Sequence, residues 1–106
     1  MSAFDILFRP AHEIAADVSS RRISAREVTE AALAAIAARD GRLNAFTAVT
    51  AERAIAEANR VDAAVIAGEA LPLAGVPYAV KNLFDVEDVV TRAGSKINRD
   101  NAPAPR

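Results

Sequence analysis

The chain has 106 residues, so it forms at most one small domain. Its 13 basic and 14 acidic side chains nearly balance, and this balance gives no electrostatic field that would attract nucleic acid or an anionic membrane. Hydrophobic residues make up 52% of the chain, which excludes the composition of a disordered protein. The absence of cysteine excludes disulfide frameworks, thiolate nucleophiles and cysteine-ligated metal sites.

Alanine dominates the apolar residues. The chain has 26 alanines against 5% aromatic residues and no tryptophan. Alanine favours helix but buries little area, so the sequence predicts helices around a thin core. The longest apolar run, residues 31–38, is too short to span a bilayer, and the N-terminus lacks the basic and apolar segments of a signal peptide. We therefore expect a cytoplasmic protein with no membrane partner.

Two helices are expected in the first half of the chain. Residues 10–19 begin with a proline, which suits a first helical turn. Ser24 and Glu27 have the spacing of a capping box, and the apolar stripe behind them predicts a helix over residues 25–40. Gly41 stands where a left-handed residue would end this second helix.

A third helix is expected over residues 51–67, with Thr50 as its cap and Gly68 at its end. Small and β-branched residues recur along it at helical spacing and form its buried side. Asp62 falls inside this stripe and contradicts the pattern.

The remaining segments do not show a helical period. Residues 44–49 are rich in Phe, Val and Thr, and residues 76–81 form a compact apolar run between a glycine and a lysine, so both are predicted to be strands. Residues 99–106 contain two prolines and no apolar pattern, which indicates an irregular tail. Helices and strands are therefore both expected within residues 1–106.

Lys81 is the residue most suggestive of chemistry. It ends the apolar run that starts at Val76, and Leu83 and Phe84 follow closely. An ammonium in apolar surroundings loses hydration, which favours the neutral amine that acts as a base or nucleophile. The local sequence also allows a lysine that ends a strand and extends its amine into water.

The residues around Lys81 resemble a known family. Residues 75–85, GVPYAVKNLFD, are similar to the first conserved block of the amidase signature family. The flanking segments agree: SARE at 24–27, LNAF at 43–46 and AGSK at 93–96. This resemblance implies an α/β fold, a mixed sheet covered by helices, of which the chain carries the N-terminal helices and first strands.

Members of this family hydrolyse amide bonds with a Ser–cisSer–Lys triad and no cofactor. The resemblance implies that Lys81 takes a proton from the bridging serine, which activates the nucleophilic serine. Both serines belong to a glycine- and serine-rich segment further along the family's chain, and none of the five serines here lies in such a segment. The chain is thus expected to carry only the lysine, to be the N-terminal portion of an amidase, and to be inactive alone.

Two features depart from the family's pattern. Asn82 stands where many members carry aspartate, so one negative charge beside the lysine is missing. Glu87 and Asp88 occupy a turn where members usually have glycine, and a left-handed aspartate there costs about 1 kcal/mol. The segments 78–85 and 93–98 most resemble the branch that hydrolyses carboxybiuret and related urea-type amides.

Two alternative functions remain open at this stage. The same block occurs in the A subunit of glutamine-dependent amidotransferases, which works with partner proteins, and a helical interaction module without catalysis would share the helices. The expected partners are a small-molecule amide and either a second copy of the chain or a small partner subunit. The substrate-binding residues are not identified.

Three other features have less specific interpretations. Ser95 and Lys96 could form a catalytic dyad, but neighbours in an extended segment point to opposite faces. His12 has no carboxylate at metal-ligand spacing, and Glu87 with Asp88 is typical of a solvated turn. We therefore expect no metal site.

Overall fold

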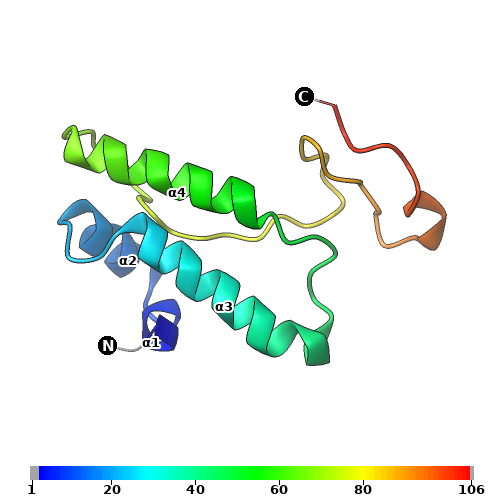
Figure 1. Cartoon of the computed structure of the whole chain (residues 1–106), viewed down its shortest axis with the longest axis horizontal. Helices are drawn as coiled ribbons and strands as arrows, with labels where there is room; N and C mark the ends of the chain where they lie inside the picture. The colour runs from blue at the N-terminus through cyan, green and yellow to red at the C-terminus, as the bar shows by residue number, and fades with distance from the viewer. Residues whose placement is uncertain (1–2, 106) are drawn as a thin grey trace.

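The computed structural model describes residues 3–105, which contain four α-helices and one 3-10 turn (Figure 1). The helices are α1 (Ala3–Leu7), α2 (Ala11–Ser19), α3 (Ala25–Leu43) and α4 (Ala51–Ile66), and the 3-10 turn η1 is Lys96–Asn98. Three of them overlap the stretches expected to be helical, whereas α1 was not expected because five residues are too few to show an apolar period. Within this described part of the chain no helix is both long and apolar enough to cross a membrane.

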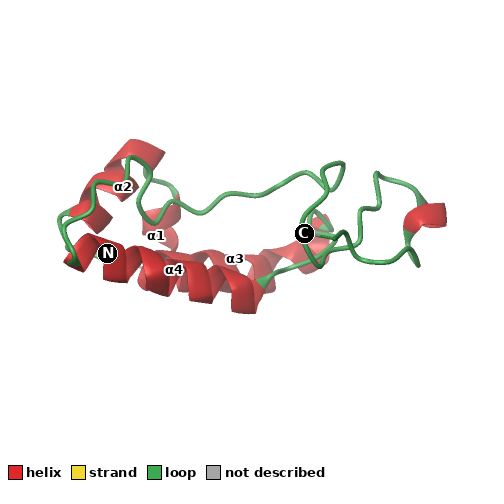
Figure 2. Cartoon of the chain, turned by 90° about the horizontal axis from the view of Figure 1, so that it is seen from above, coloured by secondary structure: helices red, strands yellow, loops and turns green. Residues whose placement is uncertain are grey.

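The helices form two layers. α3 and α4 lie side by side and run in opposite directions (Figure 1). Figure 2 shows α1, α2 and the segment that follows α4 on one side of this pair. Residues 81–105 lie beyond the end of the pair at which α3 stops and α4 begins (Figure 1). The conserved block around Lys81 therefore leads from the helical layers into this loop region.

The core is thin, as the alanine content predicts. Within residues 3–105, only Val18 and Val28 are large side chains with no more than 1% exposure. The other buried members of the cluster are small or lie at its edge: Ile14, Ala25, Ala58 and Ala74. Small side chains allow α2, α3 and α4 to approach closely, but each contributes little buried area. Stability in such a core depends strongly on a few close contacts.

The start of α3 is capped twice. The Ser24 hydroxyl accepts from the Glu27 N–H at 3.0 Å and the Glu27 carboxylate accepts from the Ser24 N–H at 2.8 Å, so the predicted capping box is present. The carboxylate of Asp62 on α4 adds two further bonds, from the N–H groups of Ala25 at 2.7 Å and Arg26 at 3.1 Å. Asp62 interrupts the apolar stripe of α4 because it caps α3.

The end of α3 differs from the sequence prediction. The helix continues through Gly41 and stops at Asn44, which adopts the left-handed conformation with φ of 50°. The Asp40 carboxylate accepts from the N–H groups of Ala45 and Phe46 at 2.7 and 3.3 Å. Asparagine tolerates the left-handed region, and this carboxylate holds the chain just beyond it. Gly41 as the terminating residue is therefore wrong.

The two predicted strands do not form among the described residues. Residues 44–49 and 76–81 are extended or bent, but no ladder pairs them with a neighbour. A strand needs a partner to receive its N–H and C=O groups, and residues 3–105 bring no such partner to either segment. The α/β assignment is therefore reduced to a helical segment with extended connections.

The tail is irregular but not free of contacts. Glu87 and Ala104 form an isolated parallel bridge. The Asp88 N–H donates to the Ala104 carbonyl at 2.9 Å, and the Ala104 N–H donates to the Val89 carbonyl at 3.0 Å. Ala104 is only 8% exposed, so the end of the described chain is tied to the loop that follows the conserved block.

Candidate active site

Lys81 lies in an extended segment and not at the end of a paired strand. Its side chain is exposed, and its carbonyl accepts from the Phe84 N–H at 3.1 Å in a tight turn. Among residues 3–105 no carboxylate lies within ion-pair distance of the Lys81 amine. The described residues thus do not supply the apolar enclosure that the sequence predicts, and they place no ion-pair partner at the amine.

Asn82 links the lysine segment to two other parts of the chain. Its side-chain amide donates to the Thr47 hydroxyl at 2.7 Å and accepts from the Arg92 N–H at 3.2 Å. Its backbone carbonyl accepts from the Ala93 N–H at 2.9 Å. Segments 35 and 10 residues away in sequence are therefore joined at the residue next to Lys81.

Residues 82–93 form a loop that is closed at its base by these Asn82 contacts. Inside it, the Thr91 hydroxyl donates to Asp85 at 2.5 Å. Arg53 in the first turn of α4 donates to the Glu87 carbonyl at 2.7 Å and ties the loop to the helical layer. Asp88 adopts a φ of 63°, so the aspartate itself takes the left-handed backbone conformation in this turn.

A small open hollow of about 250 Å³ borders this loop. Its walls come from the segment after α3, from Asn82 and from the far side of the loop: Thr47, Ala48, Thr50, Asn82, Asp88, Val89, Val90 and Arg92. Beside it, large apolar side chains of the conserved block are exposed. Tyr78 is 83%, Leu83 56% and Phe84 62% exposed. The block thus borders an open hollow with polar lining residues and also exposes large apolar side chains to solvent.

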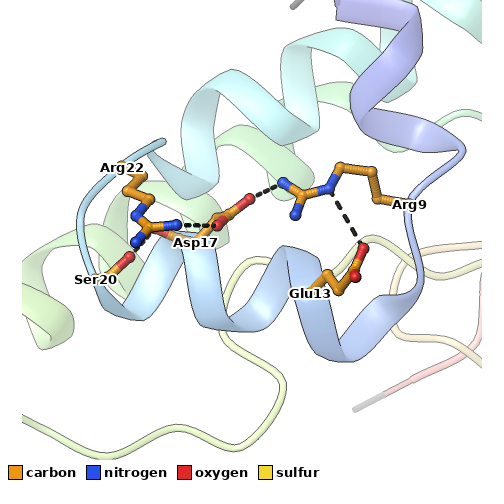
Figure 3. A network of polar contacts seen from close by, with 5 residues as sticks. All are labelled: Arg9, Glu13, Asp17, Ser20 and Arg22. Atoms are coloured by element: carbon orange, nitrogen blue, oxygen red, sulfur yellow. Dashed lines mark hydrogen bonds and ion pairs between the residues drawn. The ribbon is translucent and has the colours of Figure 1, made fainter.

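A cluster of ion pairs lies at the other end of the described molecule. Figure 3 shows the Asp17 carboxylate between the guanidinium groups of Arg9 and Arg22, with an Arg22–Asp17 distance of 3.7 Å. Arg9 also pairs with Glu13 at 3.5 Å. These ion pairs border an open groove of about 870 Å³ between α1, α2 and α3. Each acid of the cluster faces an arginine, so the cluster joins α2 to its flanking segments and offers no free base.

The other residues with possible chemistry make local contacts. The Ser95 hydroxyl accepts from the Ile97 N–H at 3.4 Å at the start of η1 and forms no hydrogen bond with the Lys96 amine. His12 is exposed. In the region covered by residues 3–105 no three histidine, aspartate or glutamate side chains are close enough to hold a metal ion. Lys81 is left as the candidate catalytic group.

Comparison with known proteins places this geometry in a family. A family model described as Amidase matches residues 27–105. This range includes the block around Lys81 and the two side-chain partners of Asn82, Thr47 and Arg92. The chain belongs to the amidase family. The resemblance inferred from residues 75–85 is thereby confirmed, although that segment forms no regular secondary structure here.

Curated relatives within the amidase family are similar over most of the chain. The 1-carboxybiuret hydrolase subunit AtzE of Pseudomonas sp. (strain ADP) is 60% identical over 93 residues, which are 87% of this chain and 20% of that protein. The A subunit of glutamyl-tRNA(Gln) amidotransferase is 44% identical over 103 residues in Pelobacter propionicus, which are 97% of this chain and 21% of that protein. The corresponding subunit of Nocardia farcinica is 50% identical over 95 residues, or 88% and 19%. The chain spans about a fifth of the length of these relatives.

Solved structures give the same result. Two structures of a vestigial protein complex described as revealing the evolutionary origins of an s-triazine catabolic enzyme, one with an inhibitor bound, match at a TM-score of 0.86. The sequence identity is 58%, and the match covers 91% of this chain and 21% of the other. At this identity and coverage, the helical arrangement described above is shared with these structures.

The contacts of Asn82 could not be predicted from the sequence, because its partners Thr47 and Arg92 lie 35 and 10 residues away. The signal available in the sequence was an amide immediately after the lysine, since an amide can donate and accept at once. Only the fold shows which groups receive those bonds.

Proposed function

We propose that this chain supplies the lysine of an amidase that hydrolyses a carboxylic amide or urea-type C–N bond. The observation that carries the proposal is the family match over residues 27–105, which includes the intact block around Lys81. Residues 1–106 are the N-terminal part of an amidase domain. The rest of the domain, which corresponds to the part of each relative outside the matching fifth, completes the sheet. The protein acts in the cytoplasm, on a small-molecule amide and without nucleic acid.

The proposed mechanism follows the Ser–cisSer–Lys pattern that the resemblance implies. The Lys81 amine accepts a proton from the bridging serine, which takes the proton of the nucleophilic serine. The nucleophile attacks the amide carbon, and the C–N bond breaks as ammonia or an amine leaves with a proton. Water then releases the acid from the acyl-enzyme. Within residues 3–105 no carboxylate forms an ion pair with the Lys81 amine, so no ion pair has to break before the amine meets its serine partner.

The urea-type branch is favoured by identity. The chain is 60% identical to a 1-carboxybiuret hydrolase subunit and 44–50% identical to two amidotransferase A subunits. A glutamine-dependent amidotransferase is the second candidate, and its support is the 97% coverage of this chain. Both relatives are named as subunits, so a second copy or a small partner subunit is proposed as a partner. A helical module without catalysis is disfavoured because it would have no need of residues 75–85.

A chimaera tests the proposal. Residues 1–106 would replace the matching fifth of AtzE, and the disappearance of 1-carboxybiuret would be followed. The chimaera is expected to be active, and Lys81→Ala should lower kcat by at least about 10²–10⁴-fold, the usual effect of removing a proton-transfer group. Lys81→Arg should fail nearly as badly, because a guanidinium stays protonated.

The control is Lys96→Ala, which removes an exposed lysine outside the conserved block. It should leave kcat within about twofold, as surface substitutions usually do. A Lys81→Arg enzyme with near-normal kcat would show that Lys81 is not the base. A second chimaera in the Nocardia farcinica subunit, assayed for glutamine hydrolysis, separates the two substrate classes: activity there and none with carboxybiuret would favour the amidotransferase.

A further inference from the structure

We propose that Asn82 is a positioning residue that, together with Thr47, fixes the backbone from which Lys81 reaches its serine partner. This inference rests on the proposed function, because it assigns Asn82 a role through Lys81. It concerns two residues to which the sequence gives no catalytic part, and the hydrogen bonds of their side chains go to groups other than the Lys81 amine.

Both ends of the Asn82 amide are used, and their orientation is determined. The Arg92 backbone N–H can only donate, so it must face the Asn82 oxygen, at 3.2 Å. The amide nitrogen then points to the Thr47 hydroxyl at 2.7 Å. Rotating the amide by half a turn would place its NH₂ against the Arg92 N–H and lose that bond. The side chain therefore has one favourable orientation.

The backbone of the same residue is held as well. The Asn82 carbonyl accepts from the Ala93 N–H at 2.9 Å, and the turn at residues 92–95 is closed by the Ser95 N–H on the Arg92 carbonyl at 3.0 Å. The Lys81 carbonyl, one peptide unit earlier, accepts from the Phe84 N–H at 3.1 Å. Two successive peptide units, those that carry the Lys81 and Asn82 carbonyls, thus each accept a backbone hydrogen bond.

Thr47 connects this arrangement to a rigid element. It lies in the segment directly after α3, where the Asp40 carboxylate holds the N–H groups of Ala45 and Phe46. A continuous path therefore runs from the last turn of α3 through Thr47 to Asn82. The hydrogen bond between Asn82 and Thr47 thus links the lysine segment back to the helical layers.

An exposed lysine needs such support to act as a base. Its side chain has four rotatable bonds, and the extended segment before it has no ladder to hold it. A misplacement of about 1 Å at a catalytic group can lower a rate by about 10²-fold. A hydrogen-bonded residue immediately after the lysine removes the backbone part of this freedom.

The AtzE chimaera also tests this inference. Asn82→Ala and Thr47→Val should each lower kcat by about tenfold or more while KM stays within about twofold, because the lysine is displaced and the substrate pocket is not. Thr47→Ser should restore kcat, since it keeps the hydroxyl. Asn82→Asp should keep kcat within about threefold. One carboxylate oxygen still accepts from the Arg92 N–H, and the Thr47 hydroxyl can rotate to donate to the other. Asn101→Ala, which loses only a local contact with Asn98, is the matched control and should be unchanged.

The variants distinguish a positioning role of Asn82 from an effect on folding and from a failure of the proposed function. Thermal unfolding of every variant separates a displaced lysine from a destabilised fold, and Thr47→Val, a near-isosteric change at an exposed residue, decides if Asn82→Ala does not fold. In a Lys81→Ala background, Asn82→Ala should change the residual rate by less than about twofold. Normal kcat in both Asn82→Ala and Thr47→Val, with Lys81→Ala inactive, overturns the positioning role and leaves the proposed function intact. Normal kcat in Lys81→Ala overturns the proposed function itself.

Discussion

Gly75→Ala is expected to destabilise the fold by about 2–4 kcal/mol, the sum of a backbone term and a packing term. Gly75 has a φ of 71°, where an L-residue costs about 1 kcal/mol. A Cβ at this position would lie 2.8 Å from Val18 Cγ2 and 3.1 Å from both Val18 Cγ1 and Ala25 Cβ. Carbon atoms prefer a separation of about 3.5–4.0 Å, and overpacking a filled core usually costs about 1–3 kcal/mol.

Two other glycines separate these terms. Gly68 has a φ of 86° and a Cβ added there would meet nothing within 4 Å, so Gly68→Ala carries the backbone cost alone, about 1 kcal/mol. Gly41 lies inside α3 with equally open space around an added Cβ and without a positive φ, so Gly41→Ala should stabilise by about 0.5–1 kcal/mol. One substitution made at three positions is thus expected to give three different results.

Urea unfolding followed by far-ultraviolet circular dichroism measures the series, with the slope m checked for constancy. A loss of about 2–4 kcal/mol is a large part of the roughly 5–15 kcal/mol that stabilises a typical small domain, so it is easily resolved. Equal losses for Gly75→Ala and Gly68→Ala would refute the reasoning. That result would mean that the turn at residues 71–76 does not lie against Val18 and Ala25.

Two further predictions use the same chain. Asp62→Ala should destabilise the fold by about 1–2 kcal/mol in the urea experiment, because the N–H groups of Ala25 and Arg26 lose their acceptors. Asp62→Asn should lose less stability, because one acceptor oxygen remains. Glu57→Ala, on the exposed side of α4, is the control and should stay within about 0.5 kcal/mol. The purified chain alone should hydrolyse no amide, because a lysine provides neither an acyl acceptor nor an oxyanion hole. Amide hydrolysis by the purified chain that disappears in Ser95→Ala would contradict this prediction and identify Ser95 as a nucleophile.

Local signals in the sequence predicted the parts of the fold that depend on neighbouring residues. The capping box at Ser24 and Glu27 involves groups three residues apart, so its pattern can be seen without the structure. Asp62 could not be interpreted in the same way. Its partners are 36 and 37 residues away, and helical periodicity treats α4 as if α3 were absent. The apparent defect in the stripe was the position of a contact between helices.

The two predicted strands are absent among the described residues because strand formation depends on distant segments and not on neighbouring residues. Composition predicts whether a segment suits a sheet, but a strand exists only when another segment receives its hydrogen bonds. Residues 44–49 and 76–81 have suitable composition and no such neighbour among residues 3–105. The end of α3 shows a smaller error of the same kind, because Asp40 favours the left-handed turn at Asn44 over one at Gly41.

The block that carries Lys81 is recognisable in sequence even though it forms no regular element, and its contacts give a physical reason. At one end, Gly75 lies so close to Val18 and Ala25 that no Cβ fits. At the other end, Asn82 makes contacts that require a donor and an acceptor on one short side chain. The extended segment between them is therefore held at its ends and not along its length. The helical layers set both anchor points, so the place of Lys81 depends on α2 and α3 through Gly75 and on the segment after α3 through Asn82.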